Sequence, residues 1–153
     1  MKTKFDIYTT TMAGNSIGGS AIIVATAEDG RSHQYEISKC FGNTPRNRAA
    51  IAMAALALAT IKEHYYGSDV RIVYYNNYVG LVLSKKDDGS WKITPRTYVD
   101  FVEKIREIAG DFNITLESSV NNPKITECLK LSKITSAVKL AEDGIEDIMD
   151  LIE

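Results

Sequence analysis

The segment KFDIYTTTMAGNSIGGSAIIVATAEDGRSHQYEISKCF, residues 4–41, decides the fold class of this 153-residue chain. Residues 4–11 alternate apolar and polar side chains, which predicts a β-strand with one buried face. Residues 20–27 and 32–41 are rich in β-branched and aromatic residues and predict two further strands. The glycine-rich residues 14–19 and Glu-Asp-Gly at 28–30 are turn sequences, and Asp-Gly favours a tight hairpin. The segment therefore predicts three antiparallel strands.

Helical and strand patterns alternate after this segment. We predict helices over 44–66, 76–84, 94–109 and 123–140, and strands over 70–75 and 113–118. Thr-Pro at 44–45 and at 94–95 combines a capping hydroxyl with a proline suited to the first helical turn. Strands reached through helical crossovers run parallel to their neighbours. The expected fold class is α/β, with a mixed five-stranded sheet flanked by helices within residues 1–140.

Composition and charge exclude several classes of protein. Hydrophobic residues make up 44% and charged residues 25%, and the net charge is −2, which is typical of a globular domain and not of a disordered chain. No apolar run approaches the ~20 residues that span a bilayer, and the N-terminus lacks a signal-peptide pattern. We therefore expect a cytoplasmic protein without a membrane partner. Two cysteines and two histidines do not have the spacing of a metal site.

Residues 141–153 differ in charge from the rest of the chain. This segment carries acidic residues and no basic ones, so the remainder is mildly basic. Ile145, Ile148, Met149 and Ile152 share one side of a helix, which predicts an acidic amphipathic C-terminal helix. Such a stripe either covers the sheet edge or docks onto a protein partner or a second copy of the chain.

Four short segments resemble type 1 ribonuclease H, in the same order along the chain. Residues 6–19 resemble the family's first strand and its glycine-containing turn, and residues 44–50 resemble the start of its central helix. Residues 73–79 resemble the end of the family's fourth strand, and residues 122–129 resemble the start of its last helix. The likeness spans about residues 4–140 and implies an RNase H-like fold with a C-terminal helical extension.

The departures from the family concern its catalytic residues. The resemblance implies an enzyme that cuts the RNA strand of an RNA–DNA hybrid with two divalent metals held by four carboxylates. The corresponding positions here are Thr10, Ala50, Tyr75 and Leu129, and none of them is acidic. Hard divalent cations need oxygen ligands, mainly carboxylates. We therefore expect a pseudo-nuclease with no catalytic residue, no metal and no cofactor.

The resemblance also implies a set of residues that contact nucleic acid. They are polar side chains at or beside positions where the family touches the duplex: Asn15, Asn47, Arg48, Asn76 and Asn77. Amides donate and accept hydrogen bonds at 2′-hydroxyls and base edges without a metal. The first hypothesis is therefore a metal-independent module that binds an RNA–DNA hybrid or another duplex. The alternative interpretation is that these asparagines occupy turns and helix caps, and that Arg48 is a structural ion-pair residue.

Three further interpretations stay open. The chain is a protein-interaction scaffold if the filled former site or the C-terminal helix binds a partner. It is a hydrolase only if metal ligands have moved, with Asp6, Glu36 and Glu117 as candidates on strands. Three lysines surround the only tryptophan, so that loop either contacts phosphates or packs on the domain edge; they are Lys85, Lys86 and Lys92, with Trp91.

Overall fold

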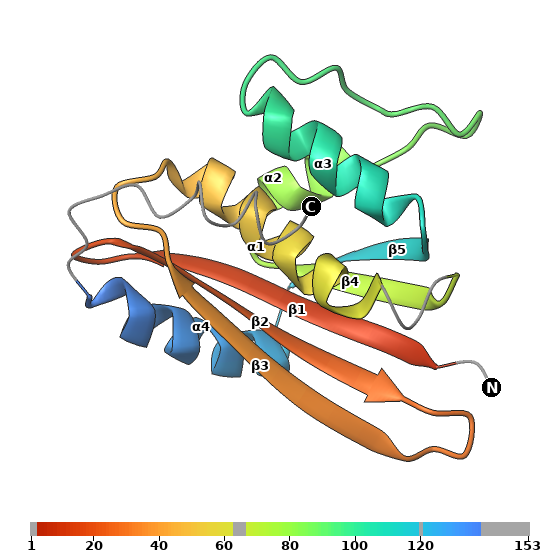
Figure 1. Cartoon of the computed structure of the whole chain (residues 1–153), viewed down its shortest axis with the longest axis horizontal. Coiled ribbons are helices and arrows are strands. Elements are labelled where there is room, and N and C mark those ends of the chain that lie inside the picture. The colour runs from red at the N-terminus through yellow and green to blue at the C-terminus, as the bar shows by residue number, and fades with distance from the viewer. Residues whose placement is uncertain (1–2, 63–66, 120, 139–153) are drawn as a thin grey trace.

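A mixed five-stranded sheet forms the centre of the computed structural model, which describes residues 3–62, 67–119 and 121–138 (Figure 1). Its strands are β1 (Lys4–Ala13), β2 (Ile17–Thr26), β3 (Ser32–Cys40), β4 (Asp69–Tyr74) and β5 (Asn113–Ser118). They lie in the order β3-β2-β1-β4-β5. The pairs β1–β2 and β2–β3 are antiparallel, whereas β1–β4 and β4–β5 are parallel. The predicted sheet is thus confirmed.

Helices cover both faces of the sheet (Figure 1). One face carries α1 (Arg46–Lys62), α2 (Asn77–Leu83) and α3 (Val99–Ala109), and the other carries α4 (Pro123–Ser136). Alternation along β1 directs Phe5 and Ile7 toward α1, and Tyr8 toward α4. None of the described helices is long and apolar enough to cross a membrane. The predicted helix at 141–153 lies outside the described residues.

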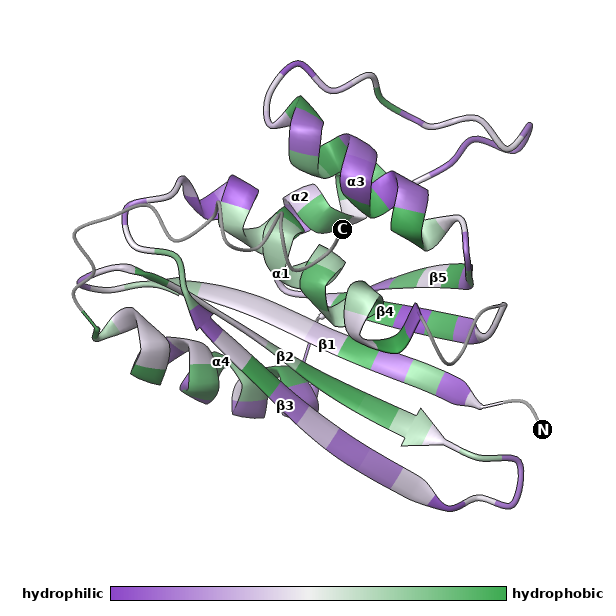
Figure 2. Cartoon of the chain, in the orientation of Figure 1, coloured by the Kyte–Doolittle hydropathy of each residue, from purple (hydrophilic) through white to green (hydrophobic). Residues whose placement is uncertain are grey.

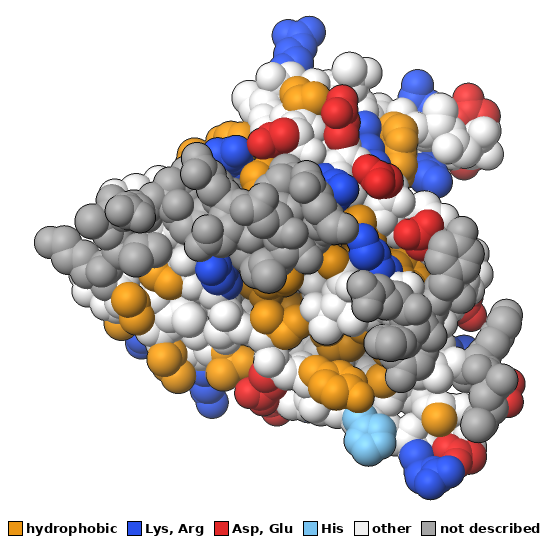
Figure 3. All heavy atoms as spheres, in the orientation of Figure 1, with side chains coloured by type: hydrophobic (Ala, Val, Ile, Leu, Met, Phe, Trp, Pro, Cys, Tyr) orange, Lys and Arg blue, Asp and Glu red, His pale blue; other side chains and the backbone are white. Residues whose placement is uncertain are grey.

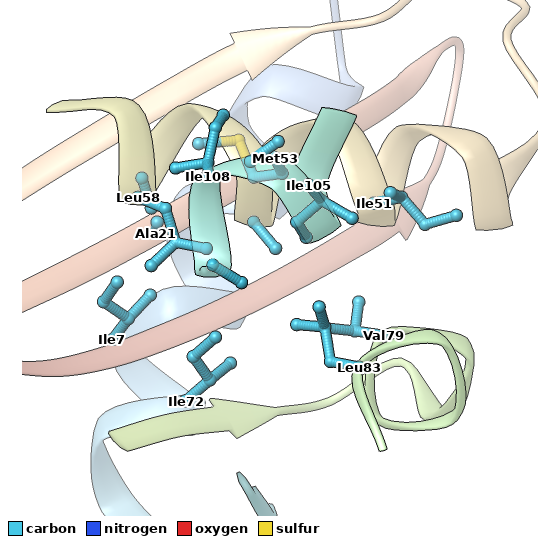
Figure 4. Packing of buried hydrophobic residues seen from close by; sticks show 14 of the residues in the cluster. Ile7, Ala21, Ile51, Met53, Leu58, Ile72, Val79, Leu83, Ile105 and Ile108 are labelled. Atoms are coloured by element: carbon cyan, nitrogen blue, oxygen red, sulfur yellow. The ribbon is translucent and has the colours of Figure 1, made fainter. Parts of the chain in front are cut away.

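The larger core lies between α1, α3 and the sheet, where Ile51, Leu58, Ile7 and Ile72 pack together (Figure 4). Helix α1 is buried on almost all sides from Ala49 to Leu58, although its sequence predicts one broad apolar face. The reason is that α3 packs on the side of α1 that faces away from the sheet. Alanines keep α1 slim enough to fit between these two layers, while α3 shows the ordinary striped pattern of a surface helix (Figure 2).

The smaller core lies between the sheet and α4. It contains Tyr8, Ile22, Val73, Ile125 and Cys128. Asn122 caps α4 by accepting a hydrogen bond from the Lys124 amide at 2.9 Å, and Pro123 follows it as predicted. The last turn of α4 closes on the β1–β2 hairpin, because the Ser16 amide donates to the Ser136 carbonyl at 3.0 Å.

Helix α4 ends at Ser136 and not at residue 140 as predicted. Two other predicted boundaries are wrong for tertiary reasons. The β1–β2 turn comprises only residues 14–16, and Gly18 and Gly19 belong to β2. Both glycines are needed there, because the backbone of α4 touches Gly18 and the Phe41 ring touches Gly19. Helix α3 begins at Val99 and not at residue 94. Tyr98 precedes it in a left-handed conformation (φ 55°), with its ring edge-to-face against Tyr78 at 6.2 Å.

We expect Gly18→Ala to lower the free energy of unfolding by about 2–3 kcal/mol, since the new methyl group overlaps the Ser132 carbonyl and the Ser136 amide. Gly110→Ala is the control, because Gly110 has a φ of −62° and its nearest neighbour to a new Cβ is a carbonyl at 3.3 Å. Urea unfolding measures both. Equal stability of the two variants would contradict the close packing of α4 on β2.

The two cysteines should differ sharply in reactivity. Burial raises the pKa of the Cys128 thiol from its ordinary 9.0 to about 11, whereas Cys40 is half-buried. At pH 8, iodoacetamide should modify Cys40 alone in the folded chain and both cysteines in urea, and a Cys40→Ser variant should stay unmodified until it unfolds.

The unfolded chain releases the Cys128 proton at lower pH than the folded chain, so the free energy of unfolding should also fall as pH rises from about 9 to 11. Rapid native labelling of Cys128 would disprove this placement.

Candidate nucleic-acid interface

An open hollow lies where β4 ends and the helices α1 and α2 begin. Its volume is about 670 Å³, and its walls are Arg46, Asn47, Tyr75, Asn76, Asn77, Tyr78 and Leu81. We call it the asparagine hollow. The parallel pairing of β1 with β4 sets its position, because Thr9 pairs with Tyr74 and the Tyr75 amide donates to the Thr9 carbonyl at 3.2 Å. The carboxyl end of β4 thus lies beside Thr9 of β1, and ligand crevices of open α/β sheets likewise lie at the carboxyl ends of strands.

Three asparagines from two distant segments line this hollow, in agreement with the residues that the sequence singles out. Asn76 is the N-cap of α2, because its Oδ1 accepts a hydrogen bond from the Tyr78 amide at 3.0 Å. Asn47 and Asn77 are exposed, and their side chains make no hydrogen bond to any part of the chain that the structure describes. Their amides are therefore free to donate and accept toward a ligand.

Arg46 also lines the asparagine hollow, although the sequence analysis did not single it out. Its Nη2 donates to the Thr11 carbonyl at 3.0 Å and its Nε donates to Thr11 Oγ1 at 3.4 Å. These bonds hold the Arg46 guanidinium at the wall of the hollow. The only signal in the sequence is that Arg46 directly precedes Asn47 in the segment that resembles the family's central helix.

Two of the predicted contact residues lie elsewhere and have structural partners. Arg48 Nη2 donates to Asp100 Oδ2 at 3.1 Å, and its guanidinium lies 5.2 Å from the centre of the Phe101 ring, so it ties α1 to α3. Successive residues of a helix point about 100° apart, which separates Arg48 from Asn47. Asn15 Nδ2 donates to the Ala137 carbonyl at 2.9 Å and joins the β1–β2 turn to the end of α4. The contacts of Asn15 and Arg48 are therefore those of a turn residue and an ion-pair residue.

The four positions aligned with catalytic carboxylates do not share one site. Thr10 faces α4, with Oγ1 2.7 Å from Ser132 Oγ and 3.3 Å from Cys128 Sγ, and Leu129 packs against the smaller core. Ala50 lies in the larger core on the opposite face, and only Tyr75 lines the hollow.

The two neighbours of Thr10 on β1 face the other side of the sheet. Alternation along β1 directs Thr9 and Thr11 toward α1, and Thr9 is the residue beside the end of β4. Neither side chain is acidic, so the chemical conclusion from this position is unchanged.

The lining of the hollow does not fit a pair of divalent metals. It offers amides, phenols, a guanidinium and a leucine, whereas Mg²⁺ and similar cations are held through carboxylates. Within the part of the chain that the structure describes, no group of three or more His, Cys, Asp or Glu side chains could hold a metal ion.

The carboxylates considered as relocated ligands have other partners or lie far apart. Arg71 Nε donates to Asp6 at 2.8 Å, and its Nη1 donates to Glu117 at 2.6 Å. Burial disfavours the charge of Arg71, but its bond to Asp6 and the nearby charges outweigh burial and raise its pKa. Glu36 lies on β3, at the opposite edge of the sheet from β5. Asp6 and Glu117 therefore belong to an ion-pair network with Arg71, and Glu36 is a surface carboxylate that accepts a hydrogen bond from Gln34 at 3.4 Å.

The tryptophan loop is separate from the hollow. Lys85 Nζ lies 4.6 Å and Arg106 Cζ lies 4.5 Å from the centre of the Trp91 ring. Arg106 also donates to the Val82 and Ile93 carbonyls at 2.9 and 3.0 Å, which fixes the loop to α3. Trp91 therefore packs on the domain edge, beside a pocket of about 410 Å³ next to β5. On the face seen in Figure 3, basic and acidic side chains are interspersed.

Comparison with known proteins agrees on the fold. No protein-family model matches the chain, and no curated protein matches its sequence. Among solved structures, LC9-RNase H1, a type 1 RNase H with the type 2 active-site motif, aligns with a TM-score of 0.69 and 10% identity over 96% of this chain and 81% of that chain. The N-terminal RNase H domain of a Mycobacterium tuberculosis protein gives 0.65 and 16% over 88% and 94%. LC11-RNase H1, solved with an RNA/DNA hybrid, gives 0.62 and 18% over 95% and 99%. At these identities the likeness concerns architecture, and the chain has an RNase H-like fold.

Proposed function

We propose that this chain is a non-catalytic RNase H-like module that binds nucleic acid, an RNA–DNA hybrid or another duplex, through the asparagine hollow. The observation that carries the proposal is the meeting of Asn47 and Asn77 with Arg46 at one end of the sheet. These amides come from segments 30 residues apart and have no other partner in the described part of the chain. A guanidinium binds phosphate, and free amides bind 2′-hydroxyls and base edges.

Two of the solved structures with this fold contain nucleic acid. LC11-RNase H1 was solved with an RNA/DNA hybrid, and a foamy viral protease-reverse transcriptase was solved with double-stranded DNA. These ligands belong to those proteins. They support the proposal because a fold of this shape accommodates a duplex.

The absence of catalysis is part of the proposal. Two-metal hydrolysis needs carboxylates that clamp the attacking and leaving oxygens. Among the described residues that line the hollow there is no carboxylate, and there is no histidine to act as a general base. Its side chains bind and orient a strand, and they supply no group that would activate water.

Binding to a labelled RNA–DNA hybrid tests this function. Affinity should fall about three- to fourfold between about 50 and 200 mM salt, as expected for about one neutralised phosphate. Magnesium should leave both strands intact. Asn47→Ala should weaken binding about five- to tenfold, because it removes a hydrogen bond of about 1 kcal/mol.

Asn113→Ala is the matched amide control, since Asn113 is exposed on β5 away from the hollow. Equal losses in the two variants, or no binding to any duplex at low salt, would contradict the proposed face. Cleavage that depends on magnesium would contradict the non-catalytic part.

A second candidate function is protein interaction, favoured by exposed apolar side chains near the C-terminal end of α4. Ile134 on α4 is 69% exposed, and Val138, two residues past the end of the helix, is 52% exposed. If this surface and the acidic segment 141–153 form an interface, the full chain should self-associate or capture a protein, and removal of 141–153 should abolish this. Light scattering that shows a monomer at every concentration would count against self-association.

A further inference from the structure

Tyr75 is a feature of the hollow that contact with a regular duplex does not explain. The residue follows β4 and its side chain is 39% exposed on the wall of the hollow. Its phenol makes no hydrogen bond and no ring contact within the residues that the structure describes. The other phenol of the hollow, Tyr78, is fixed by the Tyr98 ring and by Thr97, whose hydroxyl is 3.3 Å away. Tyr75 therefore offers a free aromatic face.

The composition of the hollow favours contact with a base over contact with the backbone. Proteins that bind duplexes through phosphates use several cations, but Arg46 is the single cationic side chain among the described residues that line the hollow. Around it lie the Tyr75 ring and two amides that have no partner among those described residues, with Leu81 44% exposed beside them. A paired base has its Watson–Crick edge and both faces occupied, whereas an unpaired base stacks on aromatic rings and bonds to amides.

We infer that the asparagine hollow takes an unpaired nucleobase that stacks on Tyr75, so that the chain recognises a bulge or a strand end within a hybrid. This inference rests on the proposed function. Asn47 and Asn77 bind the edge of the base, and Arg46 binds its phosphate. The volume of about 670 Å³ accommodates one nucleotide, since pockets for small molecules measure about 300–1,000 Å³.

The test compares three hybrids of one sequence: continuous, with one bulged nucleotide, and with an abasic bulge. The full chain should bind the bulged hybrid at least about fivefold more tightly than the other two, which is the lower range for stacking of one base. Tyr75→Phe should keep this preference because the ring remains, and Tyr75→Ala should lose it. Tyr35→Ala, on β3 and 50% exposed in the parent chain, is the matched control and should keep the preference.

The possible results separate this inference from the proposed function. Equal binding of all three hybrids would overturn the inference and leave duplex binding in place. A preference that persists with the abasic bulge would also overturn it, because the bend and not the base would then be recognised. Failure to bind any of the three at low salt would overturn both. Circular dichroism of Tyr75→Ala should match the parent, as the side chain lies at the surface.

Discussion

The parallel pairing of β1 with β4 is the constraint on which the rest of the molecule depends. It joins an N-terminal antiparallel meander to two strands that arrive after helices, and it places β1 at the centre of the sheet. Because the two strands run the same way, the carboxyl end of β4 lies beside Thr9 of β1, and the starts of α1 and α2 meet there. The hollow is a consequence of this topology and needs no special loop. Its side chains, and not its position, distinguish this chain.

The pairing requires a helix thin enough to be buried between two layers. Alanines in α1 meet that need, because larger residues would push α3 away from the sheet. On the other face of the sheet a glycine allows similarly close packing, because the backbone of α4 approaches Gly18 closely. Small residues thus set the thickness of the domain on both faces of β2.

The site shows how one residue type serves two purposes within a short distance. Asn76 caps a helix and Asn15 joins a turn to α4, whereas Asn47 and Asn77 face the solvent without a partner in the described residues. Arg46 and Arg48 divide in the same way, one at the hollow and one in an ion pair with Asp100. The described residues that line the hollow offer amides, phenols and a guanidinium, and such a surface suits neutral hydrogen bonding more than metal binding.

The strands and their antiparallel and parallel order were predictable from alternation, turn residues and helix periodicity, which are local properties of the chain. The non-acidic positions come from the resemblance to type 1 ribonuclease H. It also brought out Asn47, Asn76 and Asn77. Only the tertiary structure decided that Thr10 faces α4, that Arg46 and not Arg48 lines the hollow, and that α3 begins at Val99. The physical reason is that a side chain's partner comes from a distant segment: Ser132 for Thr10, Asp100 for Arg48 and Tyr78 for Tyr98. No local pattern encodes such a contact.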